Sequence, residues 1–157
     1  MSTNRKWLWW LVGSAWALLL VGLGVWSAMH SPATVRDQSP ISSGKATIDR
    51  VVGEVRGDLP DRWRFDDDGY HENPCRITPM RDGAAATRTL TLSGPEGTEG
   101  EALAKLASGF GDVRLRPAEG TPEGFYVDAG NFVAVRARVN GPGTVVLELK
   151  TGCRPAD

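Results

Sequence analysis

A continuous apolar stretch near the start of the chain constrains its fold more than any other feature. Residues 7–29 read WLWWLVGSAWALLLVGLGVWSAM and contain neither a charged residue nor a proline. As a helix these residues rise about 34 Å, enough to cross a hydrocarbon core of about 30 Å. Tryptophans stand near both ends of the stretch, where indole rings favour the membrane–water interface. The stretch therefore predicts a transmembrane helix.

The charges around this stretch predict its orientation. Arg5 and Lys6 precede it, whereas Arg36, the first basic residue after it, stands beside Asp37. The positive-inside rule keeps residues 1–6 in the cytoplasm as a short tail and sends the rest of the chain outside. A cleaved signal peptide is the alternative, with Val25 and Ser27 at the recognition positions. The length of the stretch and its paired tryptophans favour an uncleaved signal anchor, and either outcome exports the domain.

Small residues recur along one face of the predicted transmembrane helix. Their spacings of four, seven and four residues place them on one stripe, where helices can approach closely. The residues are Gly13, Ala17, Gly24 and Ala28. A homodimer through this stripe is one hypothesis, and the ordinary abundance of small residues in such helices is the other.

The rest of the chain has room for one modest domain. Residues 30–44 are rich in serine and proline and predict a flexible linker, and residues 45–157 predict a folded extracytoplasmic domain. Without Arg5 and Lys6, the chain carries 18 − 2 = 16 basic against 19 acidic residues, a balance of 16 − 19 = −3. This small charge gives no support for nucleic acid as a partner.

Hydrophobic periodicity predicts two helices and several short strands. Apolar residues at helical spacing predict a first helix over 48–59, capped by Ser42 or Ser43, and a second after the capping-box pair Thr98 and Glu101. Strands are predicted at 63–65, 76–79, 87–94, 112–116, 124–128, 132–139 and 144–150. The connections between strands are too short for parallel crossovers. The predicted fold class is therefore α+β, an antiparallel β-sheet with two helices packed on one face.

Alternation in the last two predicted strands identifies the side chains that should face the helices. These are Val133, Val135, Ala137, Val139, Val145, Leu147 and Leu149. Residues 66–69, DDDG, resemble the start of a calcium loop. In a calcium loop, however, the ligands stand at alternate positions, whereas these three carboxylates are consecutive. An exposed turn is therefore predicted instead. The sequence predicts no metal site and no cofactor.

The two cysteines, Cys75 and Cys153, admit a disulfide, metal ligands, a reactive thiol or two inert thiols. A structural zinc site needs four Cys or His ligands, and outside the linker only His71 joins the two cysteines. His71 stands four residues before Cys75, but Pro74 breaks the helix that would bring the two together. Exported thiols oxidise, and these two can tie the ends of the sheet together. We therefore predict a disulfide.

Four arginines on two predicted strands are candidate ligand-binding residues. Arg114 and Arg116, and Arg136 and Arg138, point away from the predicted core. Guanidinium groups on one open sheet face could hold phosphate or carboxylate polymers of the cell envelope. The alternative is a solvated, charge-paired sheet surface, since Glu148 and Lys150 lie on the same face and can pair across strands. His71 is a further candidate ligand residue, because it titrates near neutral pH.

The order of markers along the chain resembles a known group of proteins. WRFDDDGY, Cys75, the helix EALAKLASGFG, a hairpin and the closing TGCRP are similar to uncharacterised membrane-anchored extracytoplasmic domains of actinobacteria. The resemblance implies an envelope location and a mixed helix and sheet fold, and it carries no activity.

Two functions follow as hypotheses. The first is a single-pass cell-envelope protein whose domain binds a protein or an anionic envelope polymer and catalyses no reaction, since no catalytic signature is found. The alternative is a small-molecule sensor or enzyme-accessory domain with a cleft between helices and sheet. A pocket lined by Tyr70, His71, Glu72 and Tyr126 would favour this alternative.

Overall fold

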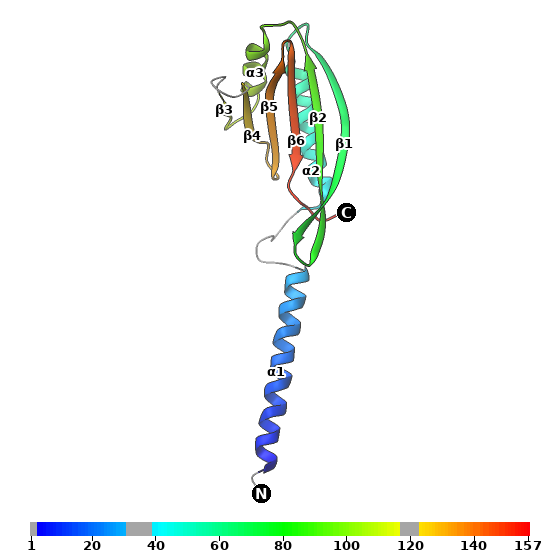
Figure 1. The fold of residues 1–157 in the computed structure, drawn as a ribbon, viewed down its shortest axis with the longest axis vertical. Helices are drawn as coiled ribbons and strands as arrows, with labels where there is room; N and C mark the ends of the chain where they lie inside the picture. Colours follow the sequence, from blue (N-terminus) through cyan, green and yellow to red (C-terminus); the bar gives the residue numbers. More distant parts are fainter. Residues whose placement is uncertain (1–2, 31–38, 117–122) are drawn as a thin grey trace.

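The computed structural model describes residues 3–30, 39–116 and 123–157 (Figure 1). The first helix, α1, spans Thr3–His30. Within it, Trp9–Ser27 is long and apolar enough to cross a membrane. The predicted helix is therefore present, over slightly more residues than the apolar stretch alone.

A six-stranded sheet forms the body of the domain. Its strands are β1 (Arg64–Thr78), β2 (Arg81–Ser93), β3 (Arg114–Arg116), β4 (Gly124–Asp128), β5 (Val133–Gly141) and β6 (Thr144–Thr151). Their order across the sheet is β1-β2-β6-β5-β4-β3, and every neighbouring pair is antiparallel. Tight hairpins join β1 to β2 and β5 to β6, as short connections require.

Two helices share one hydrophobic core with one face of this sheet. They are α2 (Ile41–Asp58) and α3 (Glu99–Ser108), and α2 runs along the sheet in Figure 1. The core joins their apolar sides to alternate residues of β2, β4, β5 and β6. Six of the seven predicted core residues are at most 4% exposed, and Val139 packs at the margin. The predicted α+β fold is confirmed.

The predicted turn at residues 66–69 is wrong. These residues lie inside β1, where the register shifts between Asp67 and Tyr70. Asp68 and Gly69 face the single residue Thr89, which is a β-bulge. Gly69 has φ +75°, and its N–H donates to Asp67 Oδ1 at 3.0 Å. The extra residue places Asp67 and Tyr70 on the same face of the sheet, where strict alternation would separate them.

Both helices begin differently from the prediction. Pro40 occupies the N-cap of α2, so the helix starts at Ile41, within the residues predicted as linker, and neither serine caps it. The Thr98 hydroxyl donates to the carbonyl of Pro95 instead of capping α3. Gly109 is the C-cap of α3. Residues 31–38 of the predicted linker lie outside the described residues.

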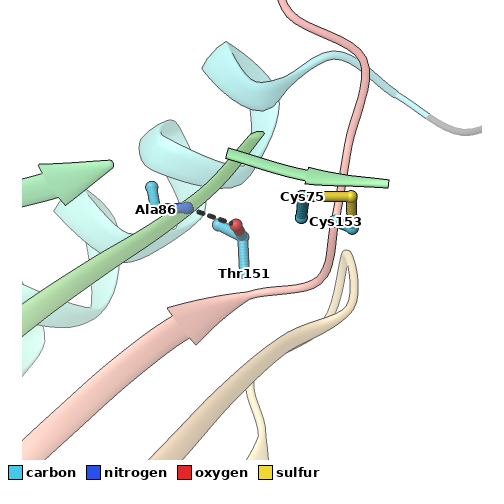
Figure 2. The surroundings of a disulfide bond; sticks show 4 residues. All are labelled: Cys75, Ala86, Thr151 and Cys153. Carbon is cyan, nitrogen blue, oxygen red and sulfur yellow. Dashed lines mark hydrogen bonds between the residues drawn. A yellow bond between two sulfur atoms is a disulfide. The ribbon is translucent and has the colours of Figure 1, made fainter. Parts of the chain in front are cut away.

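The predicted disulfide is confirmed. Cys75 in β1 bonds Cys153 after β6, with a Cα–Cα distance of 5.9 Å across 78 residues of sequence (Figure 2). In the chain-entropy model, closing a loop of this length stabilises the fold by about 4 kcal/mol. The bond thus holds the segment after β6 against the long β1–β2 hairpin.

Further contacts hold the C-terminal segment in place. Ala84 and Arg154 exchange two backbone hydrogen bonds of 2.8 and 2.9 Å, and the N–H of Ile41 donates to the carbonyl of Pro155. Figure 2 shows the Thr151 hydroxyl accepting from the Ala86 N–H at 2.9 Å. The segment therefore links the start of α2 to the β1–β2 hairpin.

Candidate functional site

The face of the sheet opposite the helices, which we call the open face, carries a groove of about 610 Å³. We call it the arginine groove. Arg114 and Arg116 come from β3, and Arg136 and Arg138 from β5, with β4 between these strands. Its other lining residues are Thr89, Leu115, Phe125, Tyr126, Val146 and Glu148. The structure thus brings together the four arginines that alternation placed on one face.

Strand register arranges these side chains in two rows across the sheet, since opposed residues of antiparallel strands share a face. The first row contains Arg114, Tyr126, Arg136, Glu148 and Thr89. The second row contains Arg116, Gly124, Arg138 and Val146. In each row, one arginine of β3 and one arginine of β5 therefore lie on opposite sides of a single β4 residue.

The arginine groove carries a net positive charge, and no ion pair among the described residues neutralises it. Its lining holds four arginines and one glutamate, so its formal charge is +4 − 1 = +3, whereas the whole chain carries −1. Among the described residues, ion pairs form at Lys45, Arg50 and Arg88, and none involves a groove arginine. Within the described residues, these four side chains are therefore available to a ligand. Exposed, unpaired guanidinium groups bind phosphate or carboxylate.

Tyr126 lies in the arginine groove, and not in a pocket with Tyr70, His71 and Glu72 that would have favoured the alternative function. The Arg136 guanidinium stacks over its ring at 5.7 Å from the centroid. The signal for this position was present in the sequence, because Tyr126 stands between Phe125 and Val127, which are both buried. A residue between two buried neighbours in a strand faces the other side of the sheet.

The predicted pocket of Tyr70, His71, Glu72 and Tyr126 does not form. Tyr70 and Glu72 point toward α2, where they contact Lys45. His71 pairs with Thr87, in the row of Lys150 and Ala134, and is exposed on the open face. It does not line the arginine groove. Alternation along β1 separates His71 from its two neighbours in sequence.

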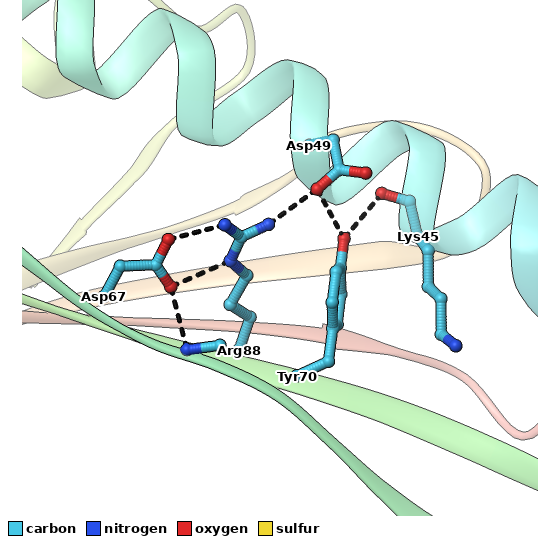
Figure 3. Close-up of polar contacts among 6 residues, drawn as sticks. Lys45, Asp49, Asp67, Tyr70 and Arg88 are labelled. Carbon is cyan, nitrogen blue, oxygen red and sulfur yellow. Dashed lines mark hydrogen bonds and ion pairs between the residues drawn. The ribbon is translucent and has the colours of Figure 1, made fainter.

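A polar cluster that the sequence analysis missed joins α2 to the β1–β2 hairpin (Figure 3). Arg88 donates from Nε and Nη2 to the two oxygens of Asp67, at 2.9 and 2.5 Å. Its Nη1 donates to Asp49 of α2 at 2.6 Å, and its guanidinium lies 4.9 Å from the Tyr70 ring centroid. Arg88 alternates with the core residue Leu90 along β2, which is the sequence signal for its position.

Tyr70 completes this cluster. Its hydroxyl lies 2.8 Å from Asp49 Oδ1 and 2.9 Å from the carbonyl oxygen of Lys45, and donates to one of them. The Lys45 ammonium pairs with Glu72 and lies 5.6 Å from the Tyr70 ring centroid. The contacts of Arg88, Tyr70 and Glu72 with Asp49 and Lys45 join the β1–β2 hairpin to α2, so the cluster fixes α2 on the sheet.

These contacts shift three pKa values. Hydrogen bonds from Arg88 hold the pKa of the Asp67 carboxyl below its usual value, and the same bonds raise the pKa of the Arg88 guanidinium. Burial, with the hydrogen bond to the Asp49 carboxylate, raises the pKa of Tyr70 to about 12. All three shifts favour the protonation states found at neutral pH, as expected for a structural cluster.

The space between the helices offers little room for a ligand. Among the described residues there, a depression of about 10 Å³ lies between α2 and α3, lined by Glu54, Val55, Asp58, Leu106, Gly109 and Phe110. This volume accommodates at most about one water molecule. The geometry therefore gives no support to the predicted cleft between helices and sheet.

Two further predictions, on the small-residue stripe and on metal binding, concern other parts of the chain. Gly13, Ala17 and Gly24 are exposed on α1, and no other part of the described chain lies within 4 Å of a Cβ placed on Gly13 or Gly24. The homodimer through this stripe stays a prediction. Among the described residues, no group of three or more His, Cys, Asp or Glu side chains is placed to hold a metal ion.

The chain was also compared with known proteins. No family model, no curated protein and no solved structure matches it.

Proposed function

We propose that this chain is a single-pass cell-envelope protein whose extracytoplasmic domain binds an anionic ligand through the arginine groove, without catalysis of its own. The N-terminal helix, long enough to span a membrane, and the Cys75–Cys153 disulfide support an exported, anchored domain. The observation that carries the binding role is the charge of +4 − 1 = +3 in one groove of a chain of net charge −1. Such a local excess of positive charge attracts anions, and the attraction becomes stronger as the anions displace water from the groove.

Binding of model polyanions to the full chain in phosphatidylcholine nanodiscs tests this proposal. Inorganic polyphosphate and oligogalacturonate supply phosphate and carboxylate groups. We expect the double variant Arg136→Gln with Arg138→Gln to bind the preferred polyanion at least about tenfold more weakly. The salt dependence of binding should also become less steep, because fewer counterions are released.

A matched control removes two charges elsewhere. Arg50 and Arg64 are exposed and lie outside the groove, so the double variant Arg50→Gln with Arg64→Gln has the same net charge as the groove variant. It should bind as the natural chain does. Equal affinity of both double variants, or no binding of either polyanion by the natural chain, would refute the role of the groove.

A further inference from the structure

The two rows of the arginine groove differ in chemistry, and this difference indicates a class of ligand. In the second row, Arg116 and Arg138 lie on either side of Gly124, so no side chain stands between them. The residues of this row that line the groove include no acid, and Asp66 of β1 lies at the far end of the row, beyond Val146 and Thr91. With neighbouring strands about 4.8 Å apart, the two arginine backbones are about 10 Å apart across β4. Both side chains can therefore reach one anionic group above Gly124.

A phosphate suits this position better than a carboxylate. One bidentate guanidinium already engages both oxygens of a carboxylate, whereas a phosphate offers further oxygens to a second guanidinium. Gly124 itself is required by packing, since a Cβ at this position would lie 2.2 Å from the carbonyl oxygen of Ala137. The absence of a side chain between the two arginines is thus a fixed property of the sheet.

The first row suits a neutral, hydroxylated ring. Tyr126 occupies the position between Arg114 and Arg136, and Arg136 stacks on its ring. Glu148 follows Arg136 in the same row, and Thr89 follows Glu148. An aromatic face packs against the apolar face of a sugar, while a carboxylate and a hydroxyl bond its hydroxyl groups. The carboxylate also makes this row less favourable for a second anion.

We infer that the groove binds a glycosyl phosphate, with the phosphate between Arg116 and Arg138 and the adjoining sugar ring on Tyr126. Adjacent rows lie two residues apart along each strand, or about 7 Å, which is compatible with a phosphate and the ring linked to it. The inference rests on the proposed function, because it assigns the ligand class of the same groove. A nucleic acid fits less well, since the groove has one tyrosine and successive bases need successive aromatic platforms.

Four oligomers of equal charge test this assignment on the full chain in phosphatidylcholine nanodiscs. They are a phosphodiester-linked hexose oligomer, a glycerol phosphate oligomer, an oligogalacturonate and an oligothymidylate. We expect the hexose phosphate oligomer to bind about tenfold more tightly than each of the others. Tyr126→Leu should abolish the advantage of the hexose phosphate oligomer over the glycerol phosphate oligomer. Arg138→Gln should weaken binding of both oligomers by about tenfold or more. Arg64→Gln, on the same face but outside the groove, should change neither.

The outcomes separate this inference from the proposed function. If all four oligomers bind equally, or Tyr126→Leu leaves the preference unchanged, the glycosyl phosphate assignment is overturned and an anion-binding groove remains. Tightest binding of oligogalacturonate or oligothymidylate overturns it as well. If no oligomer binds, or Arg138→Gln has no effect, the proposed function fails too.

A second arm distinguishes two sources of the same chemistry. Nanodiscs that contain phosphatidylinositol present a phosphate linked to a hydroxylated ring as a lipid headgroup. Weaker binding of the hexose phosphate oligomer in these nanodiscs, by competition, would assign the groove to a headgroup. Unchanged binding would assign it to a soluble or wall-linked polymer.

Discussion

At the scale of single residues, Arg88 shows how burial determines what an ion pair contributes. Its side chain is 16% exposed and it bonds both Asp67 and Asp49, whereas Arg50 is 54% exposed and pairs with Glu54 one helical turn away. Exposed pairs of this kind contribute little, because water screens them and ordering two long side chains opposes them.

We therefore expect Arg88→Gln to lower the free energy of unfolding by about 2 kcal/mol, as for hydrogen bonds to charged groups. The same substitution at Arg50, Arg50→Gln, should lower it by less than about 1 kcal/mol. Urea unfolding of the full chain in detergent micelles, followed by near-ultraviolet circular dichroism, measures both values. Equal losses would show that the Arg88 cluster does not hold α2 on the sheet.

Tyr70 gives the domain a pH dependence on the alkaline side. Its pKa in the folded state is about 12, above the ordinary value of 10.0. The folded chain thus keeps a proton that the unfolded chain releases, so the contribution of Tyr70 to stability is complete below pH 10 and is lost as pH rises to about 12.

Tyr70 and Tyr126 are the two tyrosines of the chain, so Tyr126→Phe leaves Tyr70 as the single tyrosine chromophore. We expect the tyrosinate absorbance of this variant to rise with a midpoint near pH 12 when folded and near pH 10 in urea. A folded midpoint equal to that in urea would contradict the contacts with Asp49 and Lys45.

At the scale of elements, the bulge in β1 requires a glycine. Gly69 adopts φ +75°, which a residue with a Cβ adopts at a cost of about 1 to 2 kcal/mol. A Cβ there would meet no atom within 4 Å, so the backbone alone sets this cost. Gly53 in α2 is a matched comparison, because its surroundings are equally open and its helical backbone suits alanine.

The same substitution should therefore have opposite effects at these two sites. We expect Gly69→Ala to lower the free energy of unfolding by about 1 kcal/mol and Gly53→Ala to raise it by up to about 1 kcal/mol. Denaturant midpoints at constant slope provide the measurement. Stabilisation by Gly69→Ala would mean that β1 does not adopt the bulge.

The elements differ in how far the sequence predicts them. Strands β5 and β6 follow from strict alternation of valines and leucines, and α3 follows from its apolar period. The run of three aspartates and a glycine favours a turn by local propensity, yet pairing with β2 keeps it within a strand. A cap such as Pro40 depends on the C-terminal segment, whose Pro155 accepts the first helical N–H, and no local pattern predicts it.

The candidate site, too, has parts that the sequence pattern predicts and parts that depend on contacts distant in the sequence. Alternation placed Arg136 and Arg138 opposite the buried Val135 and Ala137, and it placed Arg114 and Arg116 on one face of their strand, whose residue Leu115 is itself exposed. Tyr126 was considered only as part of a pocket that would favour the alternative function, although alternation between the buried Phe125 and Val127 places it on the face of the arginines. The difference between the row that contains Gly124 and the row that contains Tyr126 and Glu148 depends on the register of four strands, β3 to β6, which requires the structure.

At the scale of the whole molecule, the proposed topology places both cysteines outside the cell. We expect a thiol reagent that cannot cross membranes to label Cys75 and Cys153 in intact cells once an impermeant reductant has opened their disulfide. Ser2→Cys, in the proposed cytoplasmic tail, is the control and should react only after lysis. Mass spectrometry of labelled peptides identifies each site, and protection of both native cysteines in intact cells would reverse the topology.

The bulge and the acidic run of β1 have a consequence for how copies of this protein avoid one another. Among the described strands, β1 pairs with β2 alone, so its other side presents 15 residues of backbone to a neighbour. Such an edge invites another strand to add to the sheet. Asp66 and Asp68 give it repelling charge, the bulge at Gly69 interrupts its hydrogen-bonding line, and Pro74 removes a donor. Residues whose pattern favours a turn thus serve to keep copies of this domain from aggregating strand to strand.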